Sequence, residues 1–171
     1  MVRFFGTGLL LGAVLVAFVA GAVGALPQAL LPVPARHALF ALLAVPVLLR
    51  EIGLVRFPVP QNARLVPEEV QHLRRWGALQ FGFEMGTGMR TYSPSALPHL
   101  VLAAVVLVVP LPAAFALAAG FAVGRLAMPL LSNAWSDDGS WTAVWAQAER
   151  IVRPLLALTC AGSLAVAMLV P

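Results

Sequence analysis

The sequence predicts an all-α integral membrane protein, a polytopic bundle of helices. Of its 171 residues, 61% are hydrophobic and only 11% are charged. A soluble domain is about 45–50% apolar and about 25% charged, and a disordered chain is more polar still. The apolar residues also gather in stretches of about twenty, the length that a helix needs to cross a hydrocarbon core of about 30 Å. A soluble fold and a disordered chain are therefore both excluded.

The basic residues are distributed as in a membrane protein. The net charge is +4, and all eleven basic residues are arginines. They lie near the ends of apolar stretches, where positive charge orients a chain in a bilayer. We therefore expect the lipid bilayer, and no nucleic acid, as a partner. Cys160 is the single cysteine, so an intrachain disulfide is impossible and the thiol is interpreted as a small apolar filler.

We predict a single membrane domain over residues 1–171, whose first span is residues 4–26. This stretch follows one basic residue and could be a secretory signal, but its length favours a retained span. Gly8 and Gly12 in it form a G-x-x-x-G step, which lets a neighbouring helix approach closely. Residues 27–36 contain three prolines and are predicted to be a loop before the second span, residues 37–55.

The polar segment 56–76 is predicted to be a cytoplasmic loop that carries four arginines. The next stretch, residues 77–110, is too long for one straight span, because a continuous helix would be about 51 Å long at 1.5 Å per residue. Pro94 and Pro98, with Ser93 and Ser95 beside them, supply a break. We therefore predict one span broken near its middle. The alternative is four spans with a re-entrant segment.

The last two spans are predicted at residues 112–131 and 151–170, with a second cytoplasmic loop over 132–150. Gly120 and Gly124 form another G-x-x-x-G step. The positive-inside rule favours five spans over four, because four spans divide the arginines seven to four. With five spans and a cytoplasmic N-terminus, nine arginines are cytoplasmic: Arg3, Arg50, Arg56, Arg64, Arg74, Arg75, Arg125, Arg150 and Arg153.

The candidate site lies in residues 80–99, where a helix would carry one stripe of polar or small residues. The stripe consists of Gln80, Glu84, Gly88, Thr91 and Ser95. A helix that faces only lipid has no reason to carry such a stripe, so we expect it to face a polar cavity or another helix. Gly86 and Gly88 would admit a backbone or a solute. The competing interpretation is a packing seam with no ligand.

Glu84 and Arg90 are the residues of this segment that are least favourable in a membrane, since inserting a charge near the bilayer centre costs about 2.5–3.5 kcal/mol of free energy. Intramembrane ionisable residues are functional candidates by default. Glu84 and Arg90 lie six positions apart, which places them about 120° from each other around a helix. An ion pair between them within one helix is therefore not expected. The alternative is that Glu84 is protonated, or that both residues are interfacial anchors.

The prolines add a second argument for a binding site. Pro94 and Pro98 free backbone carbonyls, which are tolerated at membrane depth only inside protein or along a cavity. Transporters bind solutes at such broken helices. The full candidate set for a solute or partner is Gln80, Glu84, Gly86, Gly88, Arg90, Thr91, Tyr92, Ser93, Pro94, Ser95, Pro98 and His99. No metal is expected, because the histidines have no ligand spacing. No catalytic residue or cofactor is expected either, because the sequence has no P-loop, G-x-S-x-G or H-E-x-x-H motif.

At residues 91–101, TYSPSALPHLV, the sequence resembles the cysteine motif of the CcdA/DsbD-type transmembrane thiol carriers. The matching residues, within about 25 of the chain, are Gly86, Thr91, Tyr92, Ser93, Pro94, Leu97 and Pro98. The resemblance implies a helix broken at membrane depth and electron transfer through two cysteines on opposed helices. Ser95 stands at the cysteine position and Cys160 has no partner, so the resemblance supports the shape and not the activity.

These observations predict a small, non-enzymatic component of the cytoplasmic membrane. Its stripe would bind or pass a small solute, or seat a partner's membrane helix, with other membrane subunits or further copies as partners. A second hypothesis is an accessory of membrane thiol-redox chemistry or of cytochrome and disulfide maturation, related to the thiol carriers but lacking their cysteine pair. A third is a purely structural subunit that uses its two G-x-x-x-G steps for assembly.

Overall fold

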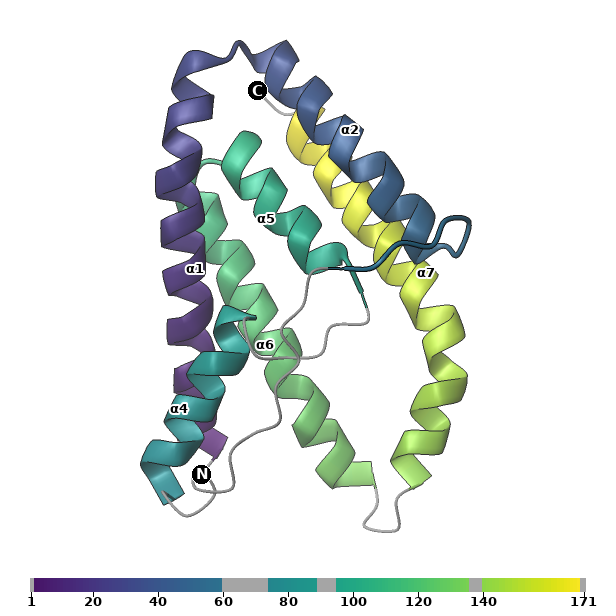
Figure 1. The fold of residues 1–171 in the computed structure, drawn as a ribbon. Helices are drawn as coiled ribbons and strands as arrows, with labels where there is room; N and C mark the ends of the chain where they lie inside the picture. Colours follow the sequence, from purple (N-terminus) through teal and green to yellow (C-terminus); the bar gives the residue numbers. More distant parts are fainter. Residues whose placement is uncertain (1, 60–73, 89–94, 136–139, 170–171) are drawn as a thin grey trace. The chain divides into compact units, whose positions relative to one another are not determined.

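The computed structural model describes residues 2–59, 74–88, 95–135 and 140–169, and these contain helices and no strand (Figure 1). The all-α prediction is confirmed. Alanine and leucine dominate the sequence of the helices and are strong helix formers. The described helices are α1 (Val2–Leu30), α2 (Val33–Glu51), α4 (Arg74–Thr87), α5 (Leu97–Leu107), α6 (Leu111–Trp135) and α7 (Ser140–Leu169).

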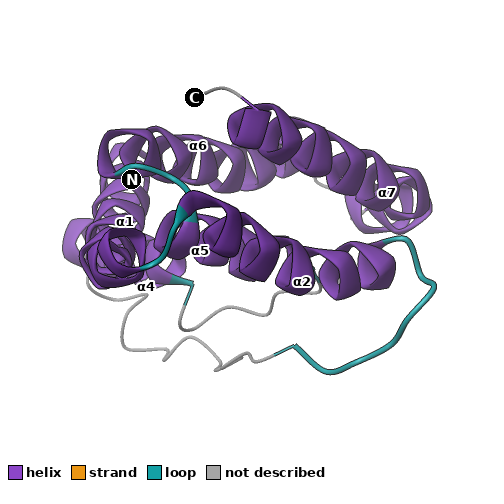
Figure 2. Ribbon diagram, turned by 90° about the horizontal axis from the view of Figure 1, so that it is seen from above, coloured by secondary structure: helices purple, strands orange, loops and turns teal. Residues whose placement is uncertain are grey.

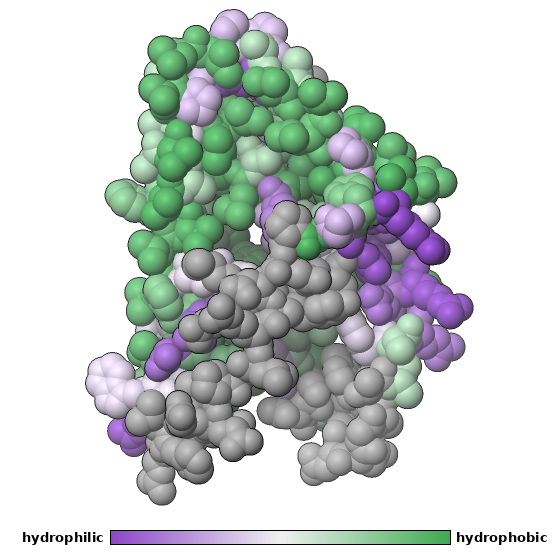
Figure 3. Space-filling view, in the orientation of Figure 1, coloured by the Kyte–Doolittle hydropathy of each residue, from purple (hydrophilic) through white to green (hydrophobic). Residues whose placement is uncertain are grey.

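Three of the described helices are long and apolar enough to cross a membrane. They are α1, α2 and the part of α6 from Leu111 to Leu131, while α5 is a shorter apolar helix. Large apolar side chains on these helices are exposed, for example Leu42 at 72% and Val123 at 67%. Hydrophobic surface covers much of the face shown in Figure 3. Exposed apolar surface of this extent indicates a membrane location.

The chain divides into two compact units. Unit 1 consists of Met1–Val19, Pro60–Ser93 and Leu111–Ala134, so it contains the first part of α1 together with α4 and nearly all of α6. Unit 2 consists of Ala20–Val59, Pro94–Pro110 and Trp135–Pro171, so it contains the end of α1 with α2, α5 and α7.

In unit 1, α4 packs against α1 through glycines of α1. A Cβ at Gly8 would meet backbone atoms of Leu79 and Phe83, and a Cβ at Gly12 would meet backbone atoms of Phe83 and Thr87. The contacted positions rise together along both helices, so α1 and α4 run parallel (Figure 1). The G-x-x-x-G step of α1 is therefore occupied by a helix of the same chain.

The same interface contains glycines of α4. A Cβ at Gly82 would meet the backbone of Phe5, and a Cβ at Gly86 would meet the backbone of Leu9. Glycine on both sides lets the two backbones touch directly, and dispersion then acts over the whole contact. We call Gly8, Gly12, Gly82 and Gly86 the glycine seam.

The third helix of unit 1, α6, has a row of buried small residues. Ala114, Ala118 and Ala122 are buried and recur every four residues, which places them on one face of the helix. The G-x-x-x-G step of α6 is different from that of α1. A Cβ at Gly120 or Gly124 would meet no atom of the described residues within 4 Å.

In unit 2, α2, α5 and α7 each contact the other two. Figure 2 shows α5 and α2 along one side and α7 along the other. Their buried apolar side chains include Phe40 and Ala44 of α2, Leu100 and Ala104 of α5, and Ala157 of α7. The N-terminus of α5 meets the C-terminus of α2, since the Ala96 N–H donates to the Glu51 carboxylate.

The C-terminal end of α5 meets the end of α1. The last carbonyls of a helix have no partner within it, and here the amide of Gln28 supplies one. Its Nε2 shares two hydrogens among three carbonyl oxygens, those of Val105 at 3.0 Å and Val106 at 3.2 Å in the last turn of α5 and that of Val109 at 3.2 Å just beyond it. Gly24, one turn earlier on α1, lets the helices come this close, because a Cβ there would meet the Val106 backbone.

The change Gln28→Leu is expected to destabilise the protein by about 1–3 kcal/mol, because it leaves these carbonyls without a donor in an apolar setting. Thermal unfolding in a non-ionic detergent measures the loss. Gln80→Leu is the matched control, since the Gln80 amide is exposed and bonds only within α4 among the described residues. Equal stability of the two variants would contradict the capping role of Gln28.

The predicted loop at residues 27–36 is shorter in the structure than the sequence suggests. α1 continues through Pro27 to Leu30 and α2 begins at Val33, so Leu31 and Pro32 alone separate them. Pro34 lies in the first turn of α2, where its missing N–H costs no helical hydrogen bond. α7 begins at Ser140, and residues 140–149 continue directly into the apolar stretch from Ile151 onward.

The predicted break in the third span lies partly outside the described residues. α4 ends at Thr87, and Gly88 has a φ of +70°, which a right-handed helix excludes. α5 begins at Leu97, with Ala96 as its N-cap. Residues 89–94, which include Pro94, are not described, so a single span broken at Pro94 and Pro98 stays a prediction.

Candidate functional site

The residues of the predicted stripe are divided between the two units. Gln80, Glu84, Gly86 and Gly88 belong to unit 1, at or just after α4. Ser95, Pro98 and His99 belong to unit 2, where α5 begins. The remaining predicted residues, Arg90, Thr91, Tyr92, Ser93 and Pro94, lie outside the described part of the chain. One continuous polar surface over residues 80–99 therefore stays a prediction.

On α4, the polar and the small residues have different roles. Gly86 belongs to the glycine seam with α1. Glu84 lies two positions from both Gly82 and Gly86, about 200° around the helix, so it faces away from the seam. The Gln80 Nε2 donates to the Glu84 carboxylate at 3.2 Å. The stripe on α4 therefore has a polar pair on the face opposite α1.

The start of α5 is held by a carboxylate from another helix. Ala96, its N-cap residue, has no side chain that can accept a hydrogen bond. The Ser95 hydroxyl accepts from the Leu97 N–H at 3.1 Å, and the Glu51 carboxylate accepts from the Ala96 N–H at 2.7 Å. A negative charge is favourable at this position, because the N-terminus of a helix carries a partial positive charge.

Glu51 is buried and lies among positive groups. Its side chain has no exposed surface. One carboxylate oxygen, Oε1, accepts from the Ala96 N–H and from Arg50 Nη1 at 2.9 Å. The other oxygen, Oε2, lies 3.6 Å from Arg153 Nη2. A buried carboxylate without such partners would be very unfavourable, so Glu51 depends on α2, α5 and α7 being assembled.

Each of the two arginines beside Glu51 has a second anchor. The Arg50 Nε donates to the Phe57 carbonyl at 3.0 Å, and its guanidinium lies 5.6 Å from the centre of the Phe57 ring. Arg153 pairs with Glu149, one turn earlier on α7, at 3.5 Å. The two guanidiniums are therefore fixed in place, with side chains that are 17% and 34% exposed.

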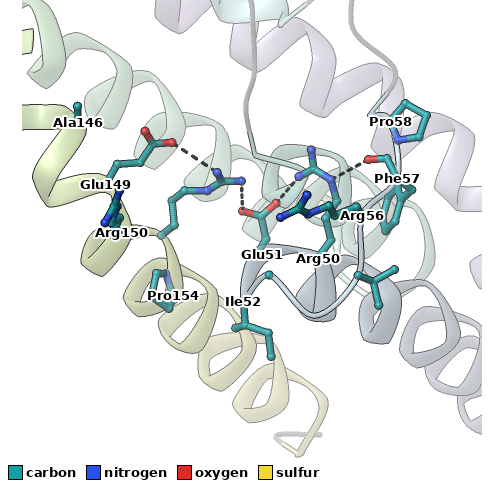
Figure 4. Close-up of a pocket in the computed structure, with 13 residues that line it drawn as sticks. Arg50, Glu51, Ile52, Arg56, Phe57, Pro58, Ala146, Glu149, Arg150 and Pro154 are labelled. Atoms are coloured by element: carbon teal, nitrogen blue, oxygen red, sulfur yellow. Dashed lines mark hydrogen bonds and ion pairs between the residues drawn. The ribbon is translucent and has the colours of Figure 1, made fainter.

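These residues line an open pocket of about 760 Å³ in unit 2 (Figure 4). We call it the arginine pocket. It combines four arginines with two glutamates, a net charge of +2 from 4 − 2, and Figure 3 shows hydrophilic surface gathered where α2 ends. The charged residues of its lining are Arg50, Glu51, Arg56, Glu149, Arg150 and Arg153.

Arg56 and Arg150 differ from the other two arginines of the pocket. Both are exposed, and neither makes an ion pair or a side-chain hydrogen bond with the described residues. Both carboxylates of the pocket are already paired with Arg50 or Arg153. The pocket therefore offers two further guanidinium groups, whose planar arrangement of donors matches the oxygens of a phosphate or a carboxylate.

The sequence interpretation missed this pocket. In the sequence these arginines serve only as signals of topology, at the ends of apolar stretches. The available signal was the charged pair Arg50 and Glu51, which directly follows a long apolar stretch. The sequence does not show that α7 brings Arg150 and Arg153 to the same place.

A metal centre receives no support from the structure. Over residues 2–59, 74–88, 95–135 and 140–169, no group of three histidine, cysteine, aspartate or glutamate side chains is placed to hold an ion. No protein-family model, curated protein or solved structure matches the chain.

Proposed function

We propose that this chain is a small, non-enzymatic component of the cytoplasmic membrane that binds an anionic group in the arginine pocket. The observation that carries the proposal is the pair of exposed guanidiniums, Arg56 and Arg150, beside a centre whose carboxylates are already neutralised. Arginine binds phosphate and carboxylate groups through parallel hydrogen bonds. The function would be transport of a small anionic solute or a place in a membrane complex.

The proposed topology has five spans and a cytoplasmic N-terminus. The parallel packing of α1 and α4 supports it, since α4 then enters the membrane from the same side as α1, with α2 as the return span. α4 and α5 would be the two halves of the broken third span, as the resemblance to the thiol carriers implies. α6 would be the fourth span and the apolar part of α7, from Ile151 onward, the fifth.

In this topology the arginine pocket opens at the cytoplasmic surface. α2 has 19 residues, so it is about 28 Å long at 1.5 Å per residue, close to the hydrocarbon thickness of about 30 Å. Glu51, its last residue, then lies at the boundary between lipid and water. The arginines of the pocket fit the cytoplasmic side by the positive-inside rule. An anion could reach them from water or from the headgroup layer.

The proposal predicts that Arg56→Gln combined with Arg150→Gln weakens anion binding at least tenfold. A ligand that binds only the folded state raises the unfolding temperature, and the rise grows with the logarithm of its concentration once that exceeds the dissociation constant. We therefore expect inorganic phosphate to raise the unfolding temperature of the purified protein in a non-ionic detergent. The double variant should need at least about tenfold more phosphate for the same shift, since each hydrogen bond between charged groups is worth about 1.5–3 kcal/mol.

The matched control is Arg3→Gln combined with Arg75→Gln, which removes the same charge outside the pocket. Both residues are exposed, so the control should keep the wild-type response to phosphate. If the two double variants respond alike, the effect of phosphate is non-specific and the pocket is not an anion site.

A further inference from the structure

We infer that the anion bound in the arginine pocket is the phosphate headgroup of an anionic membrane lipid. This inference rests on the proposed function and names the class of ligand at the same site. The shared chemistry is a phosphate ester, and a soluble phosphate compound is the alternative source. Three features of the pocket favour the lipid: its apolar border, its place along the helices and its charge.

The first feature is an apolar border that continues from the charged lining. Ile52 and Val55 line the pocket beside Arg56, and they are 47% and 40% exposed. From α7, the ring of Pro154 adds a further apolar group to the lining. A soluble anion gains nothing from these side chains. The acyl chains of a lipid would cover them and remove their surface from water.

The second feature is the position of the charges along the helices. The arginines lie where the apolar part of α2 ends and the apolar part of α7 begins. A lipid headgroup lies at this level, with its acyl chains running along the apolar parts of both helices. Basic pockets between membrane helices at the cytoplasmic side bind phosphate headgroups in this way.

The third feature is the charge that a headgroup would meet. The two carboxylates of the pocket are held by Arg50 and Arg153, so they offer little to the ammonium group of a zwitterionic lipid. Arg56 and Arg150 add positive charge that would repel an ammonium group. The pocket should therefore prefer a phosphate headgroup with net negative charge. Its volume of about 760 Å³ is ample for such a group.

The test uses the full-length protein, purified in a non-ionic detergent and freed of lipid. Three ligands are compared by native mass spectrometry and by the shift in unfolding temperature. They are phosphatidylglycerol, phosphatidylcholine with the same acyl chains, and glycerol 3-phosphate as a headgroup without chains. We expect phosphatidylglycerol to bind at least tenfold more tightly than either of the others. Arg56→Gln with Arg150→Gln should abolish its advantage over phosphatidylcholine.

The other outcomes separate this inference from the proposed function. If glycerol 3-phosphate binds as tightly as phosphatidylglycerol, the ligand is a soluble phosphate; the lipid inference falls and the anion site stands. If phosphatidylcholine binds as tightly as phosphatidylglycerol, the arginines do not select the headgroup and the inference falls. If neither phosphatidylglycerol nor glycerol 3-phosphate binds, the inference and the proposed function are both wrong. The unfolding temperature without ligand verifies that the double variant is folded.

Discussion

Replacing Glu51 with glutamine is expected to destabilise the protein by about 3 kcal/mol. Glutamine has almost the same shape and can still accept from the Ala96 N–H, but it leaves Arg50 and Arg153 without their shared negative charge. Removing one partner of a buried ion pair typically costs about 3–5 kcal/mol. The lower end of that range applies because both arginine side chains keep some contact with water, at 17% and 34% exposure.

Glu149→Gln is the matched control for this change. Glu149 pairs with the same Arg153 at 3.5 Å, but its side chain is 35% exposed. A surface pair one helical turn apart contributes only about 0.3–0.5 kcal/mol. Equilibrium unfolding of the two variants and the wild-type protein in mixed detergent gives both values. Equal losses for Glu51→Gln and Glu149→Gln would show that Glu51 does not act as a buried anchor for three helices.

Replacing Gly86 with leucine is expected to destabilise unit 1 by about 3 kcal/mol. The first side-chain carbon would meet the Leu9 backbone, which has no flexible end that can move aside. α1 and α4 would have to separate, and extra atoms in a well-packed interface typically cost about 1–3 kcal/mol. We expect a loss at the upper end of this range, because separation of the two helices also disturbs the contacts of Gly8, Gly12 and Gly82.

Gly120→Leu provides the control in a second G-x-x-x-G step. A Cβ at Gly120 meets no described atom within 4 Å, and glycine is about 1 kcal/mol worse than alanine or leucine inside a helix. This variant should therefore be as stable as the wild-type protein or slightly more so. The two leucine variants are compared by the same unfolding measurement. A loss at Gly120 equal to that at Gly86 would contradict the assignment of the seam to α1 and α4.

Part of the fold follows from local properties of the sequence. The helical, membrane-embedded character comes from long apolar stretches, which have few other stable structures in lipid. The G-x-x-x-G spacing of Gly8 and Gly12 predicts a close helix partner, because two glycines four residues apart flatten one face of a helix. Its partner, the G-x-x-x-G step at Gly82 and Gly86, is also present in the sequence. This step lies on the same helix as the polar stripe, on its opposite face.

The two G-x-x-x-G steps that were singled out in the sequence look alike, and only the tertiary structure distinguishes them. Gly8 and Gly12 are covered by α4, whereas Gly120 and Gly124 face no described atom. Spacing alone shows that a face is flat and says nothing about what lies against it. The helix ends show the same limit, since the sequence predicts a loop from Pro27 onward and the structure places Pro27 within α1.

The sequence by itself therefore determined that this chain forms apolar helices for a membrane, because span length and composition are properties of each segment alone. The arginine pocket was decided by the tertiary structure. Glu51 is 45 positions from Ala96, and Arg153 belongs to a third helix. A buried charge is tolerated only where its partners converge, and that convergence depends on how α2, α5 and α7 pack together.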